Sequence, residues 1–159
     1  MEYPNASPTL GFTEAISRAA NNILNTNGRS RRSEFWWTIL VAYVATYLIP
    51  AGFIITLFTI PLTIRRLHDT GRSGWWLLGS VILSFVLIGM LIYDFISIIL
   101  SGAYIENIYF SLITLFSKYI LLTSAALIYK IVLLIFCCMD SDPYPNQYGE
   151  SPKYSFDNK

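Results

Sequence analysis

Long apolar runs lie on both sides of a dense polar and aromatic stretch at residues 65–76, and this arrangement constrains the fold more than any other feature. The stretch reads Arg-Arg-Leu-His-Asp-Thr-Gly-Arg-Ser-Gly-Trp-Trp. Charges so close to segments of hydrocarbon length are costly unless they lie at a membrane surface and pair with one another. Only 13% of the residues are charged, against about a quarter in soluble domains, so the sequence predicts an integral membrane protein.

The basic residues are distributed unevenly, and this sets the expected topology. Arginines cluster at residues 29–32 and 65–72, whereas residues 73–117 contain no Lys or Arg. Because cytoplasmic loops are enriched in Lys and Arg, both clusters are expected on the cytoplasmic side. The first 34 residues contain no apolar core with a basic start and a cleavage site, so we expect no cleaved signal peptide and a mature chain that begins at Met1.

The N-terminal region is predicted to hold one amphipathic helix. Residues 1–11 are polar and are expected to form a loose tail. Apolar residues recur at helical spacing from Phe12 to Asn25, and Asn27-Gly28 supplies a stop. This helix either packs on the rest of the protein or lies in the lipid interface.

The next helix is expected to begin in the basic turn. Ser33 can cap it, and Glu34 complements its positive N-terminal end. Trp36 and Trp37 follow at once and are typical of interfacial anchors.

Residues 36–64 admit two interpretations. A single tilted helix would be about 43 Å long against roughly 30 Å of hydrocarbon, and it would place the two arginine clusters on opposite sides. We therefore favour two short helices of about 14 residues each, broken near Pro50-Ala51-Gly52, as a hairpin in a locally thinned bilayer.

The last two membrane helices are easier to place. Residues Trp75 to Tyr93 form a clean apolar segment, with Ser73 as its cap, Trp75 and Trp76 as anchors and Asp94 at its end. Residues 94–117 suit the outer side, and Asn107 to Phe116 is either an interfacial helix or the start of the next span.

The final span ends near Met139 and contains Lys130. If it begins at Tyr119, Lys130 lies near the bilayer centre at a cost of about 3 kcal/mol and needs a partner. If it begins near Leu112, Lys130 reaches the cytoplasmic interface instead. The tail that follows, residues 140–152, is rich in turn formers and continues no helix.

The expected fold class is therefore an all-α integral membrane protein with about four membrane helices, the first two short and hairpin-like, after the amphipathic helix. The chain is predicted to be a single membrane domain: residues 1–34 and 140–159 are cytoplasmic, and residues 35–139 carry the membrane segments. Both termini are then cytoplasmic.

The charged residues near the two clusters are the candidate site. Asp69 can pair with Arg65 or Arg66 on one helix face, Arg65 and His68 also share a face, and Glu34 and Arg31 could join them. We weigh a structural network that locks the hairpin against a binding site for anionic headgroups or a partner. The full set of candidates is Arg29, Arg31, Arg32, Glu34, Arg65, Arg66, His68, Asp69 and Arg72.

Catalysis is not expected. His68 could serve as a general base on a membrane-surface phosphate, but its neighbour Asp69 is badly placed to orient it. No nucleotide-binding loop occurs, and lipid headgroups would compete with nucleic acid for the arginines. Adjacent Cys137 and Cys138 are expected to be reduced packing residues, and neither a metal nor a cofactor is expected.

Three segments resemble the signatures of one family, in order: residues 28–36, the polar stretch 65–76, and residues 146–152, which read Asn-Gln-Tyr-Gly-Glu-Ser-Pro. They are similar to the YhaH-like small bacterial inner-membrane proteins grouped as domain of unknown function 805 (DUF805), and the likeness runs from about Phe12 to Pro152. The resemblance implies a helical protein of the bacterial cytoplasmic membrane whose activity is not established. Relative to the usual pattern, the link between the first two helices is short and extra residues lie around 94–125.

Three functional hypotheses follow. The leading one is a non-catalytic scaffold or regulator that engages anionic lipid or a partner through the Arg/His/Asp cluster, with His68 able to make this pH-sensitive. The alternative is an oligomeric channel or transport component in which Lys130 or Asp94 lines a pore. The third is an enzyme that acts on a lipid or phosphate through His68.

Overall fold

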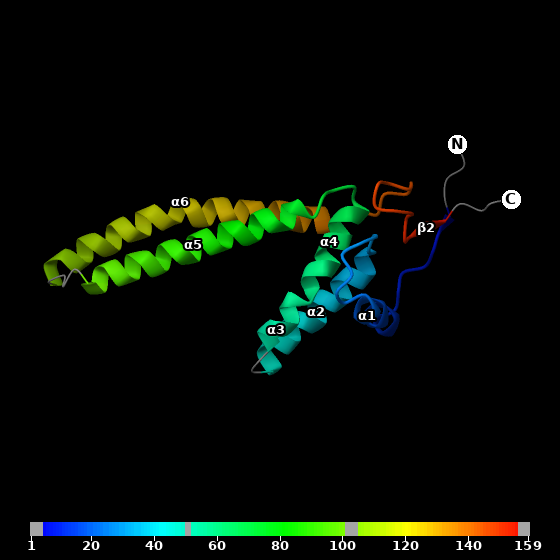
Figure 1. Cartoon of the computed structure of the whole chain (residues 1–159), viewed down its shortest axis with the longest axis horizontal. Coiled ribbons are helices and arrows are strands. Elements are labelled where there is room, and N and C mark those ends of the chain that lie inside the picture. The colour runs from blue at the N-terminus through cyan, green and yellow to red at the C-terminus, as the bar shows by residue number, and fades with distance from the viewer. Residues whose placement is uncertain (1–4, 50–51, 101–104, 156–159) are drawn as a thin grey trace. The chain divides into compact units, whose positions relative to one another are not determined.

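The computed structural model describes residues 5–49, 52–100 and 105–155. Over these residues the chain is almost entirely helical, with two very short strands (Figure 1). Its contacts divide it into two compact units: Met1–Trp75 with Ile135–Lys159, here the first unit, and Trp76–Leu134, the second unit.

Helix α1 (Phe12–Asn21) is the predicted amphipathic helix, and it packs on α2 (Arg32–Leu48). Ala15 and Ala19 are buried, and the Phe12 ring meets Trp37 edge-on with centroids 5.4 Å apart. The helix ends at Asn21 rather than at Asn25. The side-chain amide of Asn22 donates a hydrogen bond to the Arg18 carbonyl. Asparagine side chains compete in this way with the helical backbone for hydrogen bonds, which favours the end of the helix here.

Helices α3 (Gly52–Leu57) and α4 (Thr59–Asp69) form a second arm that contacts α2, as Figure 1 shows. The sequence between the arginine clusters is therefore not one continuous helix. The expected break at Pro50-Ala51 lies outside the described residues, and α2 ends just before it. Gly71, with φ of 71°, ends the second arm in the left-handed conformation that glycine adopts most readily.

A small apolar core holds the first unit together. Phe35 from α2, Leu62 from α4 and Cys137 from the end of helix α6 (Ile105–Cys138) are buried against one another, and Trp36 and Ile39 pack on them. Cys137 is thus a free thiol that packs in the core, as expected, whereas Cys138 is free and exposed. Trp36 is therefore partly buried against this core.

Two expectations for the first unit were wrong. Residues 5–10 are not loose: strand β1 (Asn5–Ala6) pairs with strand β2 (Tyr154–Ser155), and Leu10 is buried. Ser33 does not cap α2, because Arg31 occupies the N-cap position without a side-chain bond and the Ser33 hydroxyl accepts the Leu10 amide.

The second unit consists of most of α5 (Trp75–Leu100) and α6, which lie side by side (Figure 1). Ser73 caps α5 as expected, with the Trp75 amide 3.3 Å from its hydroxyl. Helix α5 does not end at Asp94 but continues to Leu100. Residues 107–116 are the early turns of α6, not a separate helix.

In the described part of the chain, two segments are long and apolar enough to cross a membrane: Trp75–Leu100 and Leu112–Cys138. No residue of α5 is buried. The second segment begins at Leu112, as in one of the two readings of the last span.

Candidate functional site

The Asp69 carboxylate is the centre of a buried polar cluster in the first unit. Asp69 ends α4, and its side chain is fully buried. Its Oδ1 accepts a hydrogen bond from Nε of Arg29 at 3.0 Å, and its Oδ2 accepts one from the Ser141 hydroxyl at 2.5 Å. Nη1 of Arg66, one turn earlier on the same helix, also donates to Oδ2. We call Arg29, Arg66, Asp69 and Ser141 the Asp69 cluster.

Two guanidinium groups surround one carboxylate, so the remaining donors of the arginines need acceptors elsewhere. Arg66 donates from Nε to the Cys137 carbonyl at 3.1 Å and from Nη2 to the Met139 carbonyl. These acceptors lie at the end of α6, where helix carbonyls lack internal partners and carry partial negative charge. The excess positive charge of the cluster is therefore balanced by a helix terminus.

Arg29 holds the C-terminal tail in the same way. Its guanidinium donates to the carbonyls of Asp142 at 2.5 Å, Tyr144 at 2.9 Å and Gly149 at 3.2 Å. One side chain thus fixes the backbone of a turn-rich segment that has no regular structure of its own. Of the arginine's side chain, only 1% is exposed.

Arg65 takes a different partner from Arg66. Its Nη2 lies 3.3 Å from Oε1 of Glu34, and both side chains are 5% exposed. The sequence allows Asp69 to pair with either Arg65 or Arg66. In the structure Asp69 pairs with Arg66, and Arg65 pairs with Glu34 of α2. Burial raises the pKa of Glu34, and the Arg65 charge opposes that rise.

Arg31 does not join this network, contrary to expectation. It donates to the Ser7 hydroxyl at 3.1 Å and to the carbonyls of Ser7 and Pro8 at 3.0 and 2.8 Å. It therefore fixes the N-terminal segment. The strand pairing of residues 5–6 accounts for this placement, because it brings Ser7 and Pro8 within reach of the basic turn.

His68 is stacked against an aromatic ring and hydrogen-bonded to the backbone. Its Nδ1 lies 3.2 Å from the Gly28 carbonyl, and its ring is parallel to that of Tyr148 with centroids 3.7 Å apart. Burial lowers the pKa of His68, which favours the neutral imidazole with its proton on Nδ1. The Asp69 carboxylate is occupied by arginines, so it does not orient this ring.

Two arginines of the candidate set remain partly open to solvent. Arg32 is 49% exposed; it donates to the Cys138 carbonyl at 3.2 Å and lies 3.7 Å from Asp140. The Arg72 guanidinium sits 3.9 Å above the Phe136 ring and donates to the Thr70 carbonyl. These two side chains are the ones that a ligand at the surface of the cluster could reach.

The remaining candidates lie on α5 and α6. Trp75 is 75% exposed, and Trp76 lies beside Tyr129, which donates its hydroxyl to the Trp76 carbonyl. Asp94 is paired with the Lys118 ammonium at 2.7 Å and accepts a hydrogen bond from Tyr119.

Lys130 is exposed, and no described residue pairs with its ammonium group. Within residues 5–49, 52–100 and 105–155, no group of three or more His, Cys, Asp or Glu side chains is arranged to hold a metal.

The contribution of the C-terminal tail to this site has no direct signal in the sequence. Ser141 binds Asp69, Asn146 donates to the His68 carbonyl at 3.0 Å, and Tyr148 covers the His68 ring. The only available signal was that residues 146–152 form the third segment of the family resemblance. This segment faces the second one, which contains His68 and Asp69.

Comparison with known proteins finds one matching family and two similar proteins. Residues 43–150 match the family described as "Protein of unknown function (DUF805)". Two relatives, from Escherichia coli (strain K12) and Escherichia coli O157:H7, are both named "Inner membrane protein YhaH". Each is 31% identical over 81 residues, which cover 38% of this chain and 67% of the relative. No solved structure matches this chain significantly.

Proposed function

The chain belongs to the DUF805 family of membrane proteins, and on that premise we propose that it is a non-catalytic scaffold or regulator of the bacterial inner membrane. It would engage anionic lipid or a membrane partner at the surface of the Asp69 cluster. The proposal depends on one observation: the charged groups of the cluster are satisfied within the protein. Arg29, Arg66 and Asp69 are buried and bound to other groups of the protein. Such a network fixes a shape and leaves no free acid or base.

The contact with lipid is assigned to two arginines beside the cluster. The side chain of Arg32 is exposed and Arg72 is partly exposed, and each basic side chain near an anionic surface contributes about 1 kcal/mol. The buried arginines act indirectly, because they fix the turns on which Arg32 and Arg72 stand.

The proposed topology has four membrane segments, with the α2 and α3–α4 arms as a short hairpin and both termini in the cytoplasm. The positive-inside rule supports this arrangement, since it puts both arginine clusters on one side. The exposed apolar side chains of the hairpin support it as well; they include Leu40, Val44, Leu48, Ile54 and Leu57.

Native mass spectrometry of the protein released from gentle detergent tests the proposal. We expect a monomer or dimer that retains phosphatidylglycerol, with retention about 30-fold weaker when Arg32 and Arg72 are both changed to Gln. The matched control is Arg18→Gln, because Arg18 is an exposed arginine on α1 outside the cluster. Equal lipid retention by all three proteins would contradict the assignment.

A second candidate, an oligomeric channel or transport component, is favoured by one observation. Lys130 lies within an apolar helix and lacks a partner among the described residues, so another copy could supply one. A defined ring of four or more copies in the same spectra would support it. Protection of a Lys130→Cys variant, in a background lacking Cys137 and Cys138, from a water-soluble thiol reagent would count against a pore position.

A further inference from the structure

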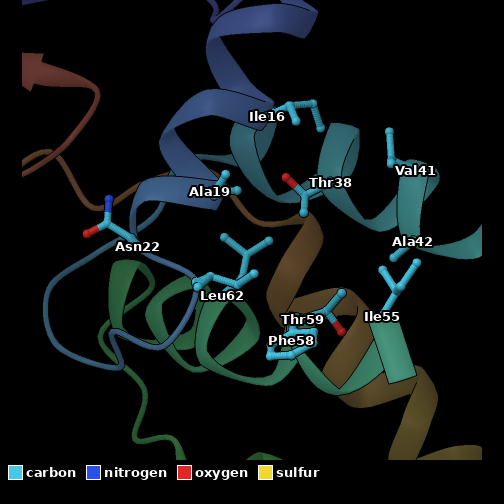
Figure 2. A pocket seen from close by; sticks show the side chains of 12 residues that line it. Ile16, Ala19, Asn22, Thr38, Val41, Ala42, Ile55, Phe58, Thr59 and Leu62 are labelled. Atoms are coloured by element: carbon cyan, nitrogen blue, oxygen red, sulfur yellow. The ribbon is translucent and has the colours of Figure 1, made fainter. Parts of the chain in front are cut away.

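An apolar groove lies between α1 and the hairpin of the first unit, apart from the Asp69 cluster (Figure 2). It has a volume of about 250 Å³ and is partly open. Its walls come from α1, α2 and the second arm of the hairpin; Figure 2 shows Ala19, Thr38, Val41, Ile55 and Leu62 around it.

The groove exists because small side chains line the contact between α1 and α2. Ala19 and Ala20 on α1 and Ala42 on α2 leave space that larger residues would fill. The larger side chains Leu62 and Phe58 close the opposite wall. The size of the groove therefore depends on the side chains of α1, α2 and the α3–α4 arm.

The polar groups of the lining already have partners inside the protein. The Thr38 hydroxyl donates to the Glu34 carbonyl at 2.8 Å, and the Asn22 amide donates to the Arg18 carbonyl while its oxygen accepts from Asn25. Thr59 also has a partner of its own. A polar ligand inside the groove would lose its hydrogen bonds to water without replacement, so the groove favours hydrocarbon.

The groove is continuous with an apolar strip on α2, because Val41 lines both the groove and a shallow depression with Leu40, Val44 and Leu48. A narrow chain could thus leave the groove along a surface that is apolar throughout.

We propose that this groove binds one acyl chain of a membrane phospholipid, with its headgroup outside. The bilayer supplies this ligand at high concentration to any apolar groove that it reaches. The site is distinct from the proposed headgroup contacts at Arg32 and Arg72, because none of its lining residues is an arginine.

Photolabelling tests the site on the full chain. The protein is reconstituted in vesicles of phosphatidylethanolamine and phosphatidylglycerol that contain a little phosphatidylethanolamine with a diazirine in one acyl chain. After illumination, peptide mapping should place the label on the groove walls, at Ile16–Ile23 and Ile55–Leu62. Because this probe lipid is zwitterionic, the result does not depend on anionic headgroup binding.

Filling the groove should remove the label. Ala20 is exposed, so Ala20→Phe can place a ring in the groove, and labelling of its walls should fall roughly tenfold as the site is occluded. Ser17→Phe adds the same ring to α1 outside the groove and should leave labelling unchanged. Val41→Gln, which makes one wall polar, is a second variant that should act like Ala20→Phe if the latter folds poorly.

Two results would overturn the proposal. One is labelling of the groove walls that is no stronger than that of exposed α5 and insensitive to both variants, which would indicate ordinary boundary lipid. The other is an unlabelled groove together with cross-links to a second copy of the chain at the same residues, which would make the face a protein contact.

Discussion

The two units of this protein differ in the charged side chains that they bury. The first unit encloses Arg29, Arg65, Arg66, Glu34 and Asp69, whereas α5 of the second unit has no buried residue. The difference shows how one chain is adapted to two surroundings. Near the arginines, the protein supplies the hydrogen bonds that water would otherwise give; along α5, it leaves the apolar surface for hydrocarbon to cover.

The largest expected effect comes from removing the charge at the centre of the first unit. Asp69→Asn keeps the shape of the side chain but leaves two buried guanidinium groups without a carboxylate. We expect a loss of about 3–5 kcal/mol in the free energy of unfolding, measured by thermal denaturation in detergent. Glu150→Gln removes an exposed carboxylate and should change little. Equal melting temperatures for the two variants would show that the cluster does not stabilise the fold.

Introducing a charge into the exposed apolar surface of α5 should also be costly, because hydrocarbon does not solvate a carboxylate. Ile88 is 52% exposed near the middle of α5, so an aspartate there would be harmless in water. In a membrane helix, Ile88→Asp should raise the apparent free energy of insertion by about 3 kcal/mol. A translocon insertion assay measures this value. Leu24→Asp, at a position 74% exposed in the first unit, is the control that should insert normally.

A smaller effect is expected where the tail meets the cluster. Ser141→Ala removes one hydrogen bond to the Asp69 carboxylate but leaves both arginines in place. Because a hydrogen bond to a charged group contributes about 1.5–3 kcal/mol, this variant should lie between wild type and Asp69→Asn. Ser17→Ala, on the exposed side of α1, is the matched control in the same denaturation measurement. A stability equal to wild type would mean that the Ser141 hydroxyl contributes nothing beyond the other contacts that hold the tail, those of Arg29, Asn146 and Tyr148.

The smallest effect concerns pH. Burial lowers the pKa of His68 below its usual value of 6.5 in the folded protein, so the unfolded chain binds the extra proton first as pH falls. The stabilisation from neutral His68 is complete above about pH 6.5 and is lost as the pH drops below that value. His68→Gln should flatten this part of the stability curve, measured by melting from pH 7.5 to 5. An unchanged slope in the variant would assign the pH dependence to other groups.

Local spacing was enough to predict much of this contrast. The periods of the apolar runs predicted the helices, and the spacing of Arg65, Arg66 and Asp69 predicted that Asp69 pairs with one of the two arginines. The choice between Arg65 and Arg66 was not accessible, since it depends on α2 presenting Glu34 to Arg65. The backbone acceptors of Arg29 were also out of reach, because carbonyl groups have no signature in a sequence.

The ends of the helices were predicted less well for a related reason. The sequence predicts that a span ends at Asp94, because an isolated carboxylate is costly in hydrocarbon. In the structure, Lys118 and Tyr119 satisfy that carboxylate from α6, and α5 continues past it. A residue that looks like a boundary in one helix can be an internal contact once its partner helix is known.

The bonds from Arg29 to the carbonyls of residues 142–149 also determine an order of assembly. These acceptors are synthesised more than a hundred residues after the arginine that holds them, with α5 and α6 in between. The contacts of Arg29 with the tail therefore cannot form until α5, α6 and the tail itself have been synthesised. Completion of the first unit is a late step in the folding of this protein.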